Sequence, residues 1–187
     1  MSNLVKLNDL DSSILIDLKY STKDNFTGKI VYPSSICAIN YETGINLLKA
    51  NEQFKEYGYS IKVFDAYRPI SVQKIFYEIY PDSDYVAKPP SGNETNYRPS
   101  HLNGMSVDIT LVDKDGNELE MPSEFDEFSQ AAKASNPDCS DKAKKNVELL
   151  VRVMEDNGFK NYEHEWWHFN DVVNKTQSYS DILPENL

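Results

Sequence analysis

Apolar and polar residues recur with two different periods along this chain, and each period predicts a different kind of element. Alternation with a period of two, bounded by turn formers, predicts strands over residues 13–19, 59–67 and 104–113. Spacing near 3.6 residues predicts helices over residues 40–58, 71–80 and 141–158. The aromatic run EWWHFN at 165–170 is strand-like. Strands and helices are mixed without regular β-α-β alternation, which favours an α+β fold.

The same spacing predicts which helix faces pack on the core. The helix over 40–58 is expected to bury the face that carries Ile45, Leu48 and Phe54, and to end at Gly58. The helix over 141–158 is expected to bury Val147, Leu150, Val151 and Met154.

Turn-forming residues predict the connections. The stretch YSTKDNFTGKIVYPSS at 20–35 reads as an ordered loop, and KDGN at 114–117 as a hairpin-type turn. Residues 81–100 form a long loop rich in Pro, Gly and Asn. Loops of that length are uncommon inside compact domains and often carry function.

Composition narrows the class of protein. A chain of 187 residues that is 40% apolar can form one domain with a sizeable core, which we place at residues 1–187. The net charge of −11 argues against nucleic acid and anionic membranes as partners, because both need clustered Lys and Arg. The N-terminal residues resemble neither a secretory signal nor a transmembrane segment, so we expect a cytoplasmic protein with Cys37 and Cys139 reduced. The oligomeric state, including a homo-oligomer, stays open.

Candidate chemistry begins with HEWWH at 164–168, which matches the H-E-x-x-H pattern of zinc proteases. That pattern needs a helix, so that both imidazoles lie on one face. Gly158 and Asn161 interrupt any helix arriving from upstream, and the surrounding aromatic residues favour a strand. The pattern also needs a third ligand, commonly a downstream Glu or His, and the residues after His168 contain no histidine and one glutamate, Glu185. A helical H-E-x-x-H site is therefore disfavoured.

The alternative site combines His101, Asp108 and His168, with Glu165 as the base. Two imidazoles and one carboxylate are a normal catalytic zinc set with one position left for water. Gly104 allows the chain to bend between His101 and a strand that contains Asp108. Spacing alone leaves a second interpretation open, in which Asp108 faces solvent and His101 is an ordinary hydrogen-bonded residue.

Several motifs together resemble a known family. SHLNGMSVDITL followed far downstream by EWWHF resembles the zinc D-alanyl-D-alanine dipeptidases of the vancomycin-resistance (VanX-like) type, within a wider group of D-Ala-D-Ala metallopeptidases. KYSTKDNFTGK (19–29), FDAYRP (64–69) and MPSEFDEFS (121–129) agree with further family segments in the same order. The resemblance runs from about residue 15 to 170. It implies the family's Hedgehog-like α+β fold, a single domain with a central antiparallel sheet flanked by helices.

The resemblance also implies roles for individual residues. His101, Asp108 and His168 would bind one Zn²⁺ per chain. Glu165 would be the general base and Arg68 would stabilise the oxyanion, while Asp126 would bind the substrate ammonium. Tyr20, Asp65 and Ser100 would support or contact the substrate. From sequence alone, Arg68 could instead form a surface salt bridge and Asp126 could be a helix N-cap.

Two departures from the family pattern stand close to the site. Pro99 occupies the place of the family serine, which puts a substrate contact there in doubt, and Ser106 replaces a small alanine. Glu165 and His168 are three residues apart, so on an ideal strand they would point to opposite faces. We therefore expect a local irregularity at 165–168. Trp166 and Trp167 are expected in the core, where they would hold Glu165 and His168 rigidly.

Three functions are consistent with these observations. The first is hydrolysis of the free dipeptide D-Ala-D-Ala to two D-alanines, which limits the supply of cell-wall precursor in glycopeptide resistance or serves dipeptide salvage. The second is a D,D-carboxypeptidase or muropeptide peptidase of the same group. The third is a non-catalytic zinc-binding interaction domain, which the presence of both Glu165 and Arg68 disfavours.

Overall fold

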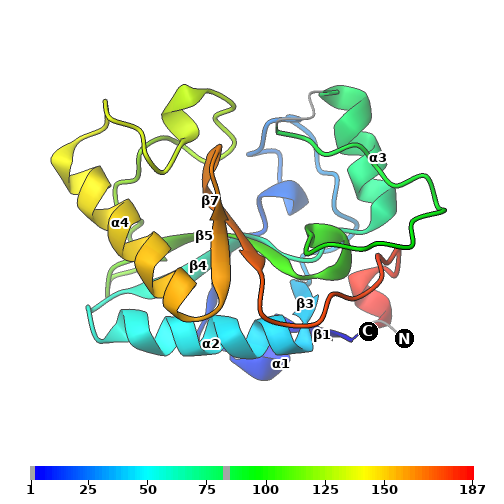
Figure 1. Cartoon of the computed structure of the whole chain (residues 1–187), viewed down its shortest axis with the longest axis horizontal. Coiled ribbons are helices and arrows are strands. Elements are labelled where there is room, and N and C mark those ends of the chain that lie inside the picture. Colours follow the sequence, from blue (N-terminus) through cyan, green and yellow to red (C-terminus); the bar gives the residue numbers. More distant parts are fainter. Residues whose placement is uncertain (1–2, 82–84) are drawn as a thin grey trace.

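A five-stranded sheet runs through the molecule in the order β2-β4-β5-β7-β6 (Figure 1). The structure is a computed structural model that describes residues 3–81 and 85–187. The strands of this sheet are β2 (Leu15–Ile16), β4 (Ser60–Asp65), β5 (Ser106–Val112), β6 (Phe159–Tyr162) and β7 (Glu165–Asp171). A separate two-stranded sheet pairs β1 (Leu4–Lys6) with β3 (Ala38–Asn40). All pairs are antiparallel except β2 with β4, where the predicted 13–19 strand is shortened to a two-residue parallel edge.

Four helices accompany the sheets: α1 (Leu7–Leu10), α2 (Tyr41–Lys55), α3 (Ile70–Ile79) and α4 (Asp141–Asp156). α2 and α4 pack against each other and against β4 and β6, whereas α3 lies on the other side of β7 (Figure 1). The predicted α+β class with a flanked, mainly antiparallel sheet is confirmed. The sequence prediction missed β1, α1, β3 and β6, each of which has only three or four residues.

The predicted helix faces are only partly right. In α2 the buried face carries Leu47, Ala50 and Phe54, together with Thr43 and Asn51, while Ile45 and Leu48 are half-buried. The buried face of α2 contains small and polar residues, and a prediction based on large apolar residues does not find them. In α4, Val153 is buried in place of the predicted Val151. Apolar residues cover a wide face of α4, so their spacing alone does not show which edge of that face is buried.

The central strand β5 is buried along its whole length, including Asp108 and Thr110. One face of β5 carries Val107, Ile109 and Leu111, which belong to the main core with residues of α2 and α4. The opposite face carries the polar residues. The alternative in which Asp108 faces solvent is therefore wrong, because its exposed fraction is 3%.

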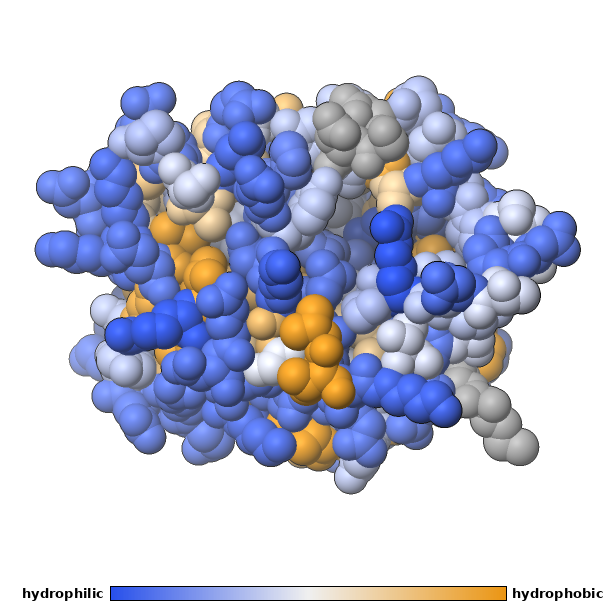
Figure 2. Space-filling model, viewed as in Figure 1, coloured by the Kyte–Doolittle hydropathy of each residue, from blue (hydrophilic) through white to orange (hydrophobic). Residues whose placement is uncertain are grey.

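The face of the molecule shown in Figure 2 is mostly hydrophilic, and the apolar areas on it are separate from one another. Within residues 3–81 and 85–187, no helix has both the length and the apolar composition needed to cross a bilayer. Cys37 and Cys139 are both free, and burial raises the pKa of the Cys37 thiol far above its usual value. Residues 82–84 of the predicted 81–100 loop lie outside the described residues.

Gly104 lies where the segment that leads into β5 approaches the backbone of β3. Its φ of 69° is left-handed, and its carbonyl accepts a hydrogen bond from the Asn40 amide at 3.0 Å. A Cβ atom at this position would lie 2.6 Å from the Asn40 nitrogen and 3.1 Å from the Ile39 carbonyl carbon. Both are backbone atoms that cannot move aside freely, so this position requires glycine.

We therefore expect Gly104→Ala to lower the free energy of unfolding by more than about 2 kcal/mol, since backbone strain and overlap add together. Gly116→Ala is the matched control, because Gly116 has a φ of 82° but no atom within 4 Å of the added Cβ. It should cost only about 1 kcal/mol, from the left-handed backbone alone. Urea unfolding of both variants measures the difference. Equal losses would contradict the close approach at Gly104.

Candidate metal centre and active site

Three polar residues stand side by side across the centre of the sheet. Asp65 at the end of β4 pairs with Asp108 of β5, and Asp108 pairs with His168 of β7. Directly opposite residues of neighbouring strands project from the same face. The register of β4 shifts between Val63 and Asp65, so that Asp65 rather than Phe64 lies opposite Asp108. One inserted residue thus completes the polar row.

His101 joins this row from a neighbouring segment. It begins a short 3₁₀ turn, His101–Asn103, that leads through Gly104 into β5. The Ser100 hydroxyl caps this turn by accepting a hydrogen bond from the Leu102 amide at 3.2 Å. The His101 Nδ1 lies 2.6 Å from the Ala66 carbonyl oxygen, so Nδ1 carries the proton and Nε2 presents its lone pair.

The donor atoms of His101, Asp108 and His168 converge on one point. Asp108 Oδ1 lies 2.9 Å from His168 Nδ1 and 3.3 Å from His101 Nε2, and the two ring nitrogens are 3.2 Å apart. Ligand atoms about 2.0–2.1 Å from one zinc ion in a tetrahedron would lie about 3.3 Å apart. This group of two imidazoles and one carboxylate therefore fits a zinc ion in spacing and in chemistry.

Neighbouring groups keep Asp108 ionised and orient the ring of His168. Although burial alone would raise it, the pKa of Asp108 is held well below its usual range by His101 and His168. The outer nitrogen of His168, Nε2, lies 3.3 Å from Asn170 Oδ1, which also accepts a hydrogen bond from the Ser106 hydroxyl at 2.6 Å. Ser106, which departs from the family alanine, thus acts on His168 through Asn170. Such outer contacts fix the ring orientation of a metal-binding histidine.

Glu165 lies beside the donor set in a bulged part of β7. Its partner strand pairs Tyr162 with Glu165 but Asn161 with Phe169, so the expected irregularity at 165–168 is confirmed. A Glu165 carboxylate oxygen lies 3.8 Å from His168 Nδ1. Burial, with smaller contributions from Asp108 and Asp126, raises the pKa of Glu165 to about 8. A carboxyl group with this proton affinity suits proton transfer near neutral pH.

The side chain of Asn161 stabilises this bulge, and the sequence prediction did not find it. Its amide nitrogen donates to three carbonyl oxygens of β7, those of Glu165, Trp166 and His168, at 3.0, 3.3 and 3.0 Å. Carbonyls that leave the ladder at a bulge need other donors. Asn161 supplies them and thereby sets the positions of Glu165 and His168 together.

Arg68 is buried, so the alternative of a surface salt bridge is wrong. Its guanidinium donates to Asp65 Oδ2 from Nε at 3.1 Å and from Nη2 at 2.7 Å. Nη1 donates to Gln73 Oε1 at 2.8 Å, and the guanidinium lies over the Phe76 ring at 4.6 Å. These contacts use three of the five N–H groups of an arginine. Arg68 also lines the cavity at the donor set.

Asp65 is a positioning residue, not a surface for substrate. It is fully buried, and it accepts hydrogen bonds from Arg68, the Tyr32 hydroxyl and the Ala66 amide. It does not line the cavity that the other candidate residues share. Asp65 therefore does not contact the substrate, contrary to one expectation from the sequence. It supports Arg68 instead. The sequence prediction missed two members of this network: Tyr32, which donates to Asp65, and Gln73, which accepts from Arg68.

Asp126 has an unusual backbone and a perturbed carboxyl group. Its φ of 60° is the only positive value at a non-glycine residue in the described chain. Its carboxylate accepts hydrogen bonds from the Tyr20 hydroxyl at 3.0 Å and from the Phe26 amide at 3.4 Å. Burial, together with Asp108, raises the pKa of Asp126 to about 7. Strained backbone at a perturbed carboxyl group is typical of binding sites. It caps no helix, because Ser129 caps the 3₁₀ turn that follows.

Both tryptophans are buried, as predicted. Trp166 Nε1 donates to the Ser123 hydroxyl at 3.1 Å, and Trp167 contacts the Phe125 ring with the centroids 5.2 Å apart. The two rings therefore connect β7 to the segment that carries Asp126. His164, by contrast, lies in the turn before β7, and it is not part of the convergent donor group.

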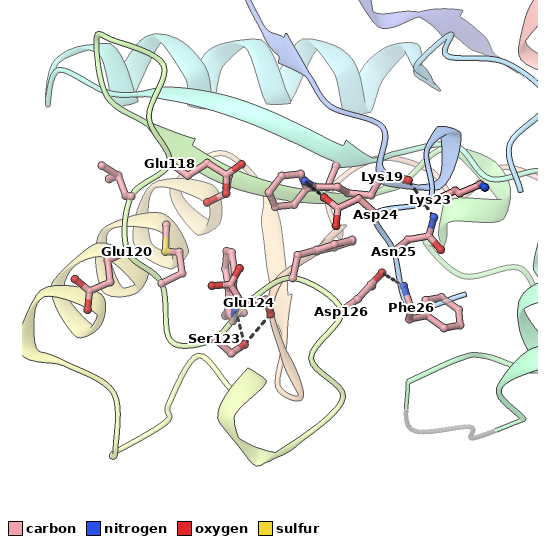
Figure 3. A pocket seen from close by; sticks show the side chains of 16 residues that line it. Lys19, Lys23, Asp24, Asn25, Phe26, Glu118, Glu120, Ser123, Glu124 and Asp126 are labelled. Atoms are coloured by element: carbon pink, nitrogen blue, oxygen red, sulfur yellow. Dashed lines mark hydrogen bonds and ion pairs between the residues drawn. The ribbon is translucent and has the colours of Figure 1, made fainter. Parts of the chain in front are cut away.

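The candidate residues share a cavity of about 490 Å³. Its walls include Tyr20, Arg68, Ser100, His101, Asp108, Asp126, Glu165 and His168. Phe26 and Asp126 also line a larger cavity of about 640 Å³, whose lining residues are drawn in Figure 3. Glu118, Glu120 and Glu124 line the larger cavity, but none of the three convergent donors does. The chemistry therefore concentrates in the smaller cavity.

Comparisons with known proteins agree on one family. The family model described as D-ala-D-ala dipeptidase, of the M15 peptidases, matches residues 1–185. The chain is 33% identical over 168 residues to the D-alanyl-D-alanine dipeptidase of Escherichia coli (strain K12), covering 90% of this chain and 84% of that protein. It is 31% identical over 179 residues to the enzyme of the same name from Enterococcus faecium, covering 87% and 88%. An LD-carboxypeptidase structure matches with a TM-score of 0.53 at 19% identity, covering 92% and 69%, which concerns the fold alone.

The convergent donors predict a result for metal binding. Asp108→Ala and His168→Ala should each lower zinc affinity by at least about 10²-fold, since each removes one of three protein ligands. His164→Ala is the matched control and should bind zinc as the unaltered protein does. Competition with a chromogenic chelator measures the affinities. Loss of zinc in His164→Ala with retention in Asp108→Ala would contradict the assignment.

The raised pKa of Asp126 predicts a pH-dependent change in stability. The pKa of Asp126 is 3.8 in a free chain and about 7 in the folded protein. Between these two pH values the folded protein binds more protons at this group than the unfolded chain does. The ionised carboxylate therefore destabilises the fold above pH 7, and this cost fades as the pH falls toward 4. Asp126→Asn should raise Tm by about 2–4 °C at pH 8 and by little at pH 5, with solvent exposure reducing the effect.

Thermal unfolding at the two pH values, with zinc present, measures this difference. The exposed Asp138→Asn serves as the control and should leave Tm nearly unchanged at both. If Asp126→Asn had a lower Tm than the unaltered protein at pH 8, the prediction would be wrong. The hydrogen bonds of the Asp126 carboxylate would then stabilise the fold by more than its desolvation costs.

Proposed function

This chain belongs to the D-ala-D-ala dipeptidase family of M15 peptidases, and from that premise we propose that it hydrolyses free D-alanyl-D-alanine to two D-alanines. The observation that carries the proposal is the convergence of His101, Asp108 and His168 beside the buried Glu165. The family alone supports dipeptide hydrolysis. The roles of the individual residues are our proposal, as is a single catalytic domain over residues 1–187.

His101, Asp108 and His168 would hold one zinc ion per chain. Zinc supplies Lewis acidity, which lowers the pKa of water and polarises a carbonyl group. All three donors line the cavity, so a zinc ion held there would be accessible to a substrate in it.

Glu165 would transfer the proton. Its carboxylate takes one proton from the attacking water, while the water oxygen forms a bond to the peptide carbon. It then gives that proton to the leaving nitrogen as the C–N bond breaks. The raised pKa of Glu165 supports this role, since a group that attracts a proton near neutral pH can both accept and return it.

Arg68 would stabilise the negative charge that develops on the peptide oxygen. Asp65 and Gln73 use three of its N–H groups, which leaves two for the cavity. Donors fixed in place before the reaction are worth a few kcal/mol of barrier, because they need no reorganisation. Stacking on Phe76 and the Asp65 ion pair supply that rigidity here.

Asp126 would bind the substrate ammonium, with Tyr20 orienting its carboxylate. A charged amine is present in a free dipeptide and absent from an acylated one. Recognition at this end therefore favours the dipeptide over longer D-Ala-D-Ala-terminated chains. The proposed biological role is removal of a cell-wall precursor from the cytoplasm, either in glycopeptide resistance or in dipeptide salvage.

The test compares zinc-loaded wild type with Glu165→Gln on D-Ala-D-Ala. The variant should bind zinc normally and lose at least about 10³-fold in kcat, because it cannot accept a proton. A chelator should abolish the wild-type activity, and added zinc should restore it. Full activity of Glu165→Gln, or activity that resists the chelator, would overturn the mechanism.

N-acetyl-D-Ala-D-Ala tests the substrate class in the same assay. We expect at least about 10²-fold lower kcat/KM, since Asp126 loses its charged partner. Equal hydrolysis of the acetylated form would favour a D,D-carboxypeptidase instead.

A further inference from the structure

A free dipeptide has a carboxylate as well as an ammonium, and three acids line the cavity that would receive it. Asp108, Asp126 and Glu165 all line it, in a chain of net charge −11. A substrate carboxylate that entered without a cationic partner would meet repulsion in a partly desolvated site. A cationic side chain at the end away from Asp126 would offset this repulsion.

Two arginines and no lysine line the cavity among the residues that the structure describes. Arg68 is not the partner for a carboxylate, because the proposed mechanism already assigns its two free N–H groups to the peptide oxygen. Arg98 has no partner: within the described residues its side chain makes no hydrogen bond and no ion pair. Its guanidinium is exposed at the cavity wall.

The backbone that carries Arg98 is nevertheless fixed. The Asn103 side chain is buried, and its amide nitrogen donates to the Arg98 carbonyl at 2.9 Å and to the Gln177 carbonyl at 2.9 Å. Its oxygen accepts from the Ser100 amide at 3.0 Å. Pro99 restricts the backbone further, since its ring locks φ. An unpaired guanidinium on an anchored backbone is suited to recognising an anion.

Arg98 and Asp126 reach the cavity from different sides. Figure 1 shows the green segment before His101 on one side of β7 and the yellow-green segment around residue 126 on the other side. Glu165 and His168 of β7 lie in the wall of the same cavity. The two charged ends of an extended dipeptide are about 7 Å apart. A dipeptide held by both ends would therefore place its peptide bond near β7.

From this arrangement we infer that Arg98 binds the C-terminal carboxylate of the substrate. The inference rests on the proposed dipeptidase function and adds a second specificity determinant to it. Asp126 selects substrates with a free amine, and Arg98 selects those with a free carboxylate. Together they define the substrate as an unblocked dipeptide and set its direction across the site.

The experiment compares D-Ala-D-Ala with its C-terminal amide, using the full zinc-loaded chain. Wild type should prefer the acid. Arg98→Gln should lose about 10- to 100-fold in kcat/KM on the acid, mainly through KM, and change little on the amide. The preference for the acid should therefore collapse. Arg98→Lys should recover most of it, because the charge is kept.

Arg152→Gln is the matched control. Arg152 is the third arginine of the chain, exposed on α4 and in contact with Tyr57 outside the cavity. This variant should behave as wild type on both substrates. Zinc content and circular dichroism establish that each variant is folded.

Two outcomes would overturn the inference. In one, Arg98→Gln keeps the wild-type preference for the acid. In the other, it loses activity equally on both substrates, which indicates a structural role. Failure of the proposed function is distinguishable, because wild type would then hydrolyse neither substrate.

Discussion

The register of three neighbouring strands is the constraint on which this site depends. Asp65, Asp108 and His168 form a row across β4, β5 and β7, and each reaches the row through pairing with the next strand. Because side chains alternate between faces, a shift of one residue would turn a member of the row toward the apolar core. An irregularity before Asp65 brings Asp65 into the row, and a second one, in the pairing of β7 with β6 between Glu165 and Phe169, positions Glu165 beside it. The departures from ideal pairing thus build the site.

Buried hydrogen bonds then make the row rigid. Asp65 holds Arg68, Arg68 holds Gln73, and Gln73 donates at 2.6 Å to the Ala87 carbonyl of the long loop. On the other side, Asn161 fixes the β7 bulge through three carbonyl oxygens. A buried network of this kind is stable only when nearly all of its members have partners. The loop, the arginine and the sheet are therefore positioned by one connected set of contacts.

The site also retains features that oppose stability. Glu165 and Asp126 are acids in surroundings that raise their pKa values to about 8 and about 7. Asp126 in addition adopts a left-handed backbone. Protein interiors tolerate such groups where binding or chemistry needs them and the rest of the fold compensates. Here the apolar face of β5, packed in the core with residues of α2 and α4, supplies the compensating burial.

The sequence by itself determined the long elements and the candidate donors. The periods in α2, α3, α4, β4 and β5 are local properties, and a chain with three histidines offers few ways to build a zinc site. The aromatic run EWWHFN indicated a strand, and the spacing of Glu165 and His168 indicated its bulge. Tertiary structure alone decided that Asp65 supports Arg68, that Asn161 holds the bulge and that Arg98 has no partner within residues 3–81 and 85–187. These facts depend on contacts between residues that are distant in sequence or on hydrogen bonds across a folded bulge. Local periodicity cannot predict such contacts, because they form only after the strands have paired in their final register.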